Sequence, residues 1–295
     1  NLCVNPEFLR EGSAVDDTFK PDRVVIGDDW GRGAKVLRKL YQRFYRASPP
    51  PFLQTNTVNA EMIKYASNFF LAAKVSLINE VANICQRTPS ADVEVVAKGV
   101  GMDRRIGPLF LKAGLGYGGS CFPKDVRALI SYAKQKNYSP ILLEAVENLN
   151  NKQPFVAVEL AEKMAGPLKG KTAAILGLSF KPNTDDIREA VSLKIIDKLL
   201  DEGCLVRVYD PAAMENVRRI YGDKLVYAEN ATKCLESADF CIVATEWDEF
   251  RKLRPKDFHT RMKTPIVVDG RRIYDPENFS KLLLYNAVGL GPSSS

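Results

Sequence analysis

Two kinds of hydrophobic pattern divide the chain. Between residues 57 and 86 apolar residues recur every three or four positions, as they do on one face of a long helix; Ile63, Phe70 and Leu77 belong to this stripe. From residue 172 onward they form short unbroken runs, at 172–178, 205–209, 240–244 and 266–268, with helical stretches between them, such as 191–202. Unbroken apolar strands that alternate with helices are typical of a parallel sheet covered on both faces. The pattern therefore predicts a helical central domain, residues 57–165, followed by a doubly wound α/β domain, residues 166–295.

Shorter elements are expected around the long helix. The residues before it suggest strands at 23–27 and 52–56, a basic amphipathic helix at 33–46, and the end of another strand at 2–4. Further helices are expected at 93–99, from Pro123 onward, at 141–160 and at 155–165. The turn-rich stretch G-P-L-K-G-K, residues 166–171, marks the start of the α/β domain.

One glycine-rich stretch, G-L-G-Y-G-G-S-C-F-P-K-D at residues 114–125, carries the strongest chemical signal. Its glycines allow positive φ and a close approach to a ligand. Pro123 suits the first turn of a helix, which places Cys121 at a helix N-terminus, where the dipole and free amides favour a thiolate. Lys124 and Asp125 belong to the same turn. We interpret this as a loop that presents a nucleophilic thiol.

Two simpler interpretations compete with the nucleophile. Most cysteines outside disulfides are small buried hydrophobes. The loop also matches G-x-G-x-x-G through Gly114, Gly116 and Gly119, but a dinucleotide site needs a strand on each side of the helix, and another helical pattern follows here. Elsewhere, the G-R-G-A-K-V segment that begins at Gly31 lacks the third glycine of such a fingerprint.

Composition narrows the functional class without naming it. The chain has 295 residues, is 45% hydrophobic and 26% charged, and carries a net charge of +6 that is not gathered in a basic run, so nucleic acid is not indicated. No membrane span and no signal peptide are recognised, and the six scattered cysteines do not suggest a disulfide scaffold, so we expect a cytoplasmic protein. No metal site is predicted. His259 is the one histidine, and we interpret it as a surface residue, which disfavours Cys–His chemistry.

Basic residues follow the first and last predicted strands of the α/β domain. Ligands of parallel sheets lie at the carboxyl ends of the strands. Lys181, Arg188, Arg271 and Arg272 follow such ends and together suit a pyrophosphate, although each alone is equally well explained as a solvated loop charge. On the long helix, Lys64 and Asn68 are four residues apart and share a face, for which a solvated flank is the simpler explanation.

Several segments, in order along the chain, resemble the UDP-glucose/GDP-mannose dehydrogenase family. They are N-P-E-F-L-R-E-G, K-Y-A-S-N, M-D-R-R-I-G, G-Y-G-G-S-C-F-P-K-D, G-L-S-F-K-P-N-T-D-D-I-R-E and D-G-R-R. The resemblance implies oxidation of the C6 alcohol of a nucleotide sugar to a carboxylate, with two NAD and a cysteine thioester. UDP-glucose is the first choice of substrate, and GDP-mannose or another UDP-sugar are alternatives. The α/β domain is then a Rossmann-like nucleotide-sugar-binding domain.

The resemblance also assigns roles to residues. Cys121 resembles the nucleophile that traps the aldehyde; Lys64, with Asn68 beside it, resembles the group that stabilises oxyanions; Asp125 resembles the carboxylate that assists proton transfer, and Glu7 the residue of thioester hydrolysis. Arg188 resembles a contact to the NAD phosphates. The residues that resemble substrate contacts are Glu11, Arg105, Phe110, Lys112, Gly114, Tyr117, Gly118, Phe180, Lys181 and Arg271, of which Arg105 would reach a neighbouring subunit's substrate.

The family begins with a Rossmann domain that carries the NAD glycine fingerprint, and residues 1–56 resemble only its C-terminal end. On this interpretation the chain as given binds a nucleotide sugar without a tight NAD site. Two alternatives stay open: a non-catalytic nucleotide-sugar-binding protein, and a cysteine-dependent transferase or hydrolase. The long helix shows more apolar surface than one layer covers, so a homodimer through it is expected.

Overall fold

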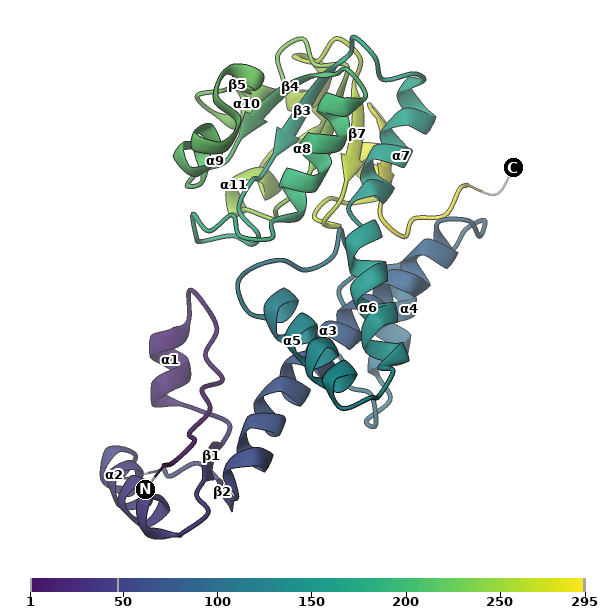
Figure 1. Cartoon of the computed structure of the whole chain (residues 1–295). Coiled ribbons are helices and arrows are strands. Elements are labelled where there is room, and N and C mark those ends of the chain that lie inside the picture. Colours follow the sequence, from purple (N-terminus) through teal and green to yellow (C-terminus); the bar gives the residue numbers. More distant parts are fainter. Residues whose placement is uncertain (1, 47, 294–295) are drawn as a thin grey trace. The chain divides into compact units, whose positions relative to one another are not determined.

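A computed structural model describes residues 2–46 and 48–293 and divides into two compact units, residues 1–70 and 71–295 (Figure 1). The long helix α3, Thr57–Cys85, crosses the boundary between them and matches its predicted range closely. The three domain boundaries predicted from the sequence stay predictions, and residues 1, 47, 294 and 295 of those domains lie outside the described residues. In the part of the chain that the structure describes, no helix is both long and apolar enough to cross a membrane.

The first unit contains a small β-α-β arrangement. The strands β1, Val24–Gly27, and β2, Phe52–Thr55, pair in parallel and are joined through α2, Arg32–Phe44. Val24, Ile26 and Ala34 form its core. The strand predicted at residues 2–4 is wrong, because only Val4 makes a single antiparallel bridge, to Gly27. The helix α1, Ala14–Phe19, was not predicted; it is six residues long and has no buried residue.

The second unit begins with the second half of α3, and four further helices come after it in the sequence. Its helices are α4, Val93–Gly101, α5, Phe122–Gln135, α6, Ile141–Lys152, and α7, Phe155–Ala165. The uninterrupted helical pattern predicted at 141–160 is wrong, because the helix ends before Pro154, which has no amide hydrogen to continue it. The helix predicted at 155–165 is confirmed as α7.

The rest of the second unit is a six-stranded parallel sheet in the order β5-β4-β3-β6-β7-β8. Its strands are β3, Thr172–Leu176, β4, Leu205–Tyr209, β5, Val226–Tyr227, β6, Phe240–Val243, β7, Ile266–Asp269, and β8, Leu284–Ala287. The connecting helices are α8, Val191–Asp201, α9, Met214–Tyr221, α10, Ala231–Cys234, α11, Asp248–Arg251, α12, Pro255–His259, and α13, Pro276–Phe279, with a short 3-10 helix at Gly222–Lys224. Strands β5 and β8 were not predicted. Relative to β3, the strand order is that of dinucleotide-binding Rossmann domains, 3-2-1-4-5-6.

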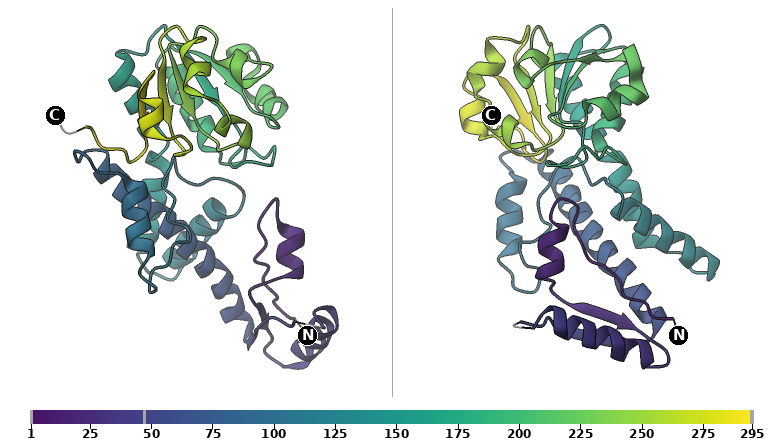
Figure 2. Two further views of the ribbon diagram at one scale, coloured as in Figure 1. Left: turned by 180° about the vertical axis from the view of Figure 1, so that it is seen from behind. Right: turned by 90° about the vertical axis from the view of Figure 1, so that its left-hand side faces the viewer.

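Alternate residues of the central strands enter two separate hydrophobic cores. On one face Ile175 and Val208 pack with α7, α8 and α9; on the other, Leu176 and Val243 pack with the helices α10 to α13. Figure 2 shows helices on both faces of this sheet. The predicted doubly wound parallel sheet is therefore confirmed.

Candidate functional site

Cys121 occupies the N-cap position of α5, as the glycine-loop pattern predicts. All six cysteines are described and none forms a disulfide. Cys121 is the exposed one; Cys3 is half-buried, and Cys85, Cys204, Cys234 and Cys241 are buried. Burial raises the pKa of Cys204 to about 11 and that of Cys234 to about 12. The accessible thiol is thus the one that the sequence singled out.

The first turn of α5, which begins after Cys121, also contains the carboxylate of Asp125. The amide of Asp125 donates to the Cys121 carbonyl oxygen at 2.9 Å, which closes the first helical hydrogen bond. The Asp125 side chain is 3% exposed, and one of its oxygens lies 2.6 Å from the Lys124 ammonium. Cys121 and Asp125, both predicted catalytic residues, therefore share one helical turn.

The glycine loop is packed against the segment that follows β3. A Cβ atom at Gly118 would overlap the Glu189 carbonyl oxygen, and one at Gly119 would lie 2.7 Å from the Phe180 ring. The Gly119 amide donates to the Arg188 carbonyl oxygen at 2.9 Å. Only glycine allows such close approach, so these glycines join the thiol-bearing loop to the α/β domain.

A cluster of charged residues missed by the sequence analysis links the same two segments. Arg127 on α5 makes two hydrogen bonds to Glu189, at 2.8 and 2.9 Å, and a third to Glu147 on α6, at 2.8 Å. The Arg127 guanidinium lowers the pKa of Glu189. The i to i+4 pattern of α5 gives no hint of these partners, because Glu189 lies 62 residues away in the sequence.

Arg271 and Arg272 have different surroundings. The Arg271 guanidinium donates to the carbonyl oxygens of Ala244, at 2.7 Å, and Gly116, at 3.2 Å, so it lies at the glycine loop. Arg272 instead makes two 2.7 Å hydrogen bonds to Asp92, and its side chain is only 4% exposed. The inclusion of Arg272 in a pyrophosphate-binding set is therefore wrong, because its charge is buried against a carboxylate.

The other predicted contacts of the second unit are more exposed. Arg188 pairs with Asp186 at 2.6 Å, and Arg105 pairs with Asp103 at 2.6 Å, with 66% and 89% of their side chains exposed. Lys181 lies over the Phe180 ring at 5.3 Å. The roles of these three basic residues stay predictions.

Aromatic rings connect the glycine loop to the start of α5. The Phe110 ring is 6.3 Å from that of Phe122, which in turn is 5.7 Å from that of Tyr117. Tyr117 is 9% exposed, and burial raises the pKa of its hydroxyl. The predicted contact of Tyr117 to substrate stays a prediction. Lys112 is exposed beside this group.

In the first unit, two predicted catalytic residues contact each other. The Lys64 ammonium on α3 lies 3.0 Å from a carboxylate oxygen of Glu7, whose other oxygen accepts the Leu9 amide at 2.6 Å. Asn68 is 7% exposed one turn after Lys64, so the two do not form the solvated flank that was the simpler explanation. Glu11 is exposed.

Two residues that the sequence analysis overlooked hold the Glu7 segment against α3. The Arg23 guanidinium lies 4.0 Å from the centre of the Phe8 ring and donates to the Ser67 hydroxyl at 3.1 Å. A phenylalanine next to Glu7 and an arginine at the start of β1 were the available signal. Without the fold, nothing related them to residue 67.

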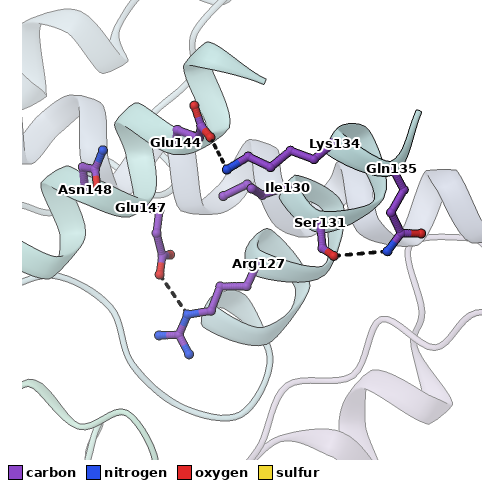
Figure 3. A pocket seen from close by; sticks show the side chains of 8 residues that line it. All are labelled: Arg127, Ile130, Ser131, Lys134, Gln135, Glu144, Glu147 and Asn148. Carbon is purple, nitrogen blue, oxygen red and sulfur yellow. Dashed lines mark hydrogen bonds and ion pairs between the residues drawn. The ribbon is translucent and has the colours of Figure 1, made fainter. Parts of the chain in front are cut away.

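A groove lies between α5 and α6, apart from the predicted catalytic residues (Figure 3). Lys134 and Glu144 form an ion pair across it at 2.7 Å, and Arg127 and Glu147 line its other end. Among residues 2–46 and 48–293, no group of three or more His, Cys, Asp or Glu is arranged to hold a metal ion.

Three family models match the chain. They are the central domain of the UDP-glucose/GDP-mannose dehydrogenase family at residues 58–152, its UDP binding domain at 174–276 and its NAD binding domain at 1–45. UDP-glucose 6-dehydrogenase from Rickettsia bellii is 42% identical over 98% of this chain and 67% of its own length. The chain belongs to the UDP-glucose/GDP-mannose dehydrogenase family.

Other relatives show the same family and a difference in length. The UDP-glucose 6-dehydrogenase TuaD of Bacillus subtilis is 44% identical over 98% of this chain and 62% of its own length. The UDP-glucose dehydrogenase structure from Pyrobaculum islandicum matches 97% of this chain and 63% of its own chain, with 40% identity and a TM-score of 0.88. The chain thus spans about three-fifths of the length of several dehydrogenases that it matches.

The family's domains divide the predicted site residues. The central-domain match contains Lys64, Asn68, Cys121 and Asp125; the UDP binding domain match contains Phe180, Lys181, Arg188 and Arg271; and the NAD binding domain match contains Glu7 and Glu11. The predicted NAD cofactor agrees with the last match. The UDP binding domain has the strand order of a dinucleotide-binding fold. The acid that directly follows its second strand, β4, is Asp210. This side chain is 1% exposed and accepts the amides of Leu178 and Ser179, so it is bound within the domain.

Proposed function

We propose that the protein oxidises UDP-glucose to UDP-glucuronate, using two NAD and a covalent intermediate on Cys121. The observation that carries the proposal is the exposed thiol at the N-cap of α5, which ends a glycine loop packed on the UDP binding domain. The 40–45% identity to UDP-glucose 6-dehydrogenases supports UDP-glucose as the substrate.

The nucleotide sugar is proposed to bind along the glycine loop. Glycine amides approach a ligand closely, and the Arg271 guanidinium already lies within hydrogen-bond distance of the Gly116 carbonyl oxygen. Phe180 and Lys181 flank the same loop from the segment after β3. These residues would orient the hexose so that C6 faces the Cys121 thiol.

In each of two oxidations NAD, when bound, accepts a hydride from C6 of the sugar. The first removes a hydride from the alcohol carbon and a proton from its hydroxyl, which leaves an aldehyde. The Cys121 thiolate then adds to C6: the C–S bond forms, the carbonyl π pair moves to oxygen, and the oxygen takes up the proton that the thiol gave up, giving a thiohemiacetal. Loss of the second hydride and of the hydroxyl proton produces a thioester.

Hydrolysis releases the acid and restores the thiol. Water adds to C6 of the thioester and the C–S bond breaks with its electron pair returning to sulfur. We assign proton transfer to Asp125 and assistance to the water to Glu7, since carboxylates can act as bases without histidine. Lys64 and Asn68 are assigned to stabilise negative charge on the reacting oxygen. Such electrostatic stabilisation of the transition state is often the largest contribution to catalysis.

Two features of the described residues suit NAD. The elements β1, α2 and β2 form a β-α-β unit, as expected of a nucleotide-binding fold, and the exposed Arg188 guanidinium could pair with a phosphate in place of Asp186. The alternative function is nucleotide-sugar binding without oxidation. A protein of this kind would have the same thiol and loop but would form no reduced cofactor.

A panel of nucleotide sugars tests the proposed function. With NAD, and with the NAD binding domain complete, UDP-glucose should produce reduced cofactor, followed by absorbance, at two equivalents per sugar consumed, whereas GDP-mannose and UDP-galactose should react at least about tenfold more slowly. One equivalent per sugar would contradict the second oxidation. Binding of UDP-glucose with no reduced cofactor would favour the non-catalytic alternative.

We also propose that the protein forms a homodimer through α3. Phe70, Leu77 and Ile84 recur every seven residues on this helix and are 70%, 61% and 60% exposed in the single chain. Large apolar side chains in a row along one helix face mark an association surface. A second copy fits because the same stripe on both helices is self-complementary about a two-fold axis.

Light scattering tests the dimer with a matched pair of variants. The protein should have twice the 32.8 kDa of one chain at micromolar concentration. Leu77→Glu should shift it to a monomer, since a charge would be buried at the interface. Leu142→Glu, on α6 at the same 61% exposure, should leave the dimer intact. A wild-type monomer, or equal dissociation by both variants, would contradict the proposal.

A further inference from the structure

The backbone of the glycine loop runs through the interior without belonging to a helix or strand. Residues 113–117 are all buried, yet none of them is in regular secondary structure. Buried amide and carbonyl groups need hydrogen-bond partners, and an unpaired one costs as much as a lost hydrogen bond. The partners of this loop are therefore part of what defines its conformation.

Three buried carboxamides from two helices supply these partners. Asn79 on α3 accepts the Gly114 amide at 2.8 Å, and Gln153, directly after α6, donates to the Gly114 carbonyl oxygen at 2.9 Å. Asn150 on α6 accepts the Tyr117 amide at 2.9 Å and donates to the Tyr117 carbonyl oxygen at 3.0 Å. The exposed fractions of Asn79, Asn150 and Gln153 are 1%, 6% and 1%.

Asn150 pairs with the loop as a neighbouring strand would. Its side-chain oxygen accepts the Tyr117 amide and its side-chain nitrogen donates to the Tyr117 carbonyl oxygen. One side chain can do both only if it carries a donor and an acceptor side by side. Gly116 makes room for it: φ is +94° there, and a Cβ would lie 2.6 Å from the Asn150 amide oxygen. Neither a larger residue at 116 nor an acid at 150 would reproduce this arrangement.

We propose that Asn79, Asn150 and Gln153 are positioning residues, which hold the loop as a preformed cradle for the nucleotide sugar and thereby place Cys121. The thiol lies four residues beyond the Tyr117 anchor, and its own side chain makes no capping hydrogen bond to α5. Its position thus depends on the anchored loop before it and on the first turn of α5 after it. This inference rests on the proposed function, because it assigns the sugar to this loop.

The experiment compares Asn150→Ala with two controls. Asn148→Ala removes the same side chain from an exposed position on the same helix. Val217→Ala truncates a fully buried residue of α9, a helix that supplies none of the loop's carboxamide partners, and should lower the unfolding midpoint. All variants are measured at temperatures well below their unfolding midpoints, so that a loss of stability alone changes neither ligand binding nor the reactivity of the thiol.

Two readings are taken: calorimetric binding of UDP-glucose, and the rate at which iodoacetamide alkylates Cys121 without ligand, followed by peptide mass spectrometry. Asn150→Ala should weaken binding about tenfold, the effect of losing paired buried hydrogen bonds. It should also speed alkylation at least about threefold, because a released loop lets the thiol move. The two controls should change both readings less than about twofold.

Equal effects of Asn150→Ala and Val217→Ala, or none from Asn150→Ala, would overturn the inference. If Asn150→Ala does not fold, Asn79→Ala decides by the same criteria, since it removes the acceptor of the Gly114 amide and leaves Asn150 in place. If the wild-type protein binds no nucleotide sugar, the proposed function fails, and the ligand-free alkylation rates still decide whether Asn150 positions the thiol.

Discussion

In the complete, active enzyme, Cys121→Ala should abolish formation of the sugar acid, by at least about 10³-fold, because no thioester can form without the thiol. The structure leaves no second exposed thiol to replace it, since the other five cysteines, all described, are buried or half-buried. The measurement is acid formation from UDP-glucose and NAD by chromatography, with unfolding followed in parallel.

Cys85→Ala and Cys204→Ala are the matched controls for this prediction. Both thiols are buried, and burial raises their pKa, so neither is available as a nucleophile. These variants should retain acid formation within about threefold of wild type while losing some stability. Equal loss in all three variants would indicate a folding defect and count against Cys121 as the nucleophile.

Arg272→Met should destabilise the second unit by about 3 kcal/mol. Its guanidinium is 4% exposed and holds both oxygens of Asp92, so truncation leaves a carboxylate without its partner. Because Asp92 is 27% exposed, water compensates in part, and we expect the lower end of the range for broken buried pairs. For a unit of this size, that corresponds to a fall in Tm of about 6–12 °C.

An exposed ion pair provides the comparison. Lys198 on α8 and Glu202, the residue that follows this helix, are 44% and 39% exposed, so Lys198→Met should leave the free energy of unfolding nearly unchanged. Both variants are followed by denaturant unfolding. A loss below about 1 kcal/mol for Arg272→Met would show that this pair contributes little to the free energy of unfolding.

Local chemistry explains why much of the fold was predictable. The strands β3, β4, β6 and β7 are short, largely apolar runs, and α7 ends just before Gly166, so these elements are visible within a few residues of sequence. Cys121 was placed correctly at the start of α5 because Pro123 and the glycines before it define that boundary locally. The two-residue strand β5 and the strand β8, L-Y-N-A, lack such a signal.

The sequence by itself determined the alternation of helices and strands, the family motifs in their order, and the one cysteine at a helix start. The tertiary structure alone decided what surrounds that cysteine. Asn79, Asn150 and Gln153 bind the loop from 35, 33 and 39 residues away, and Asp92 neutralises Arg272 across 180 residues. Periodicity reports burial and propensity within one element, whereas a buried carboxamide or charge shows its role only when folding brings its partner within hydrogen-bond distance.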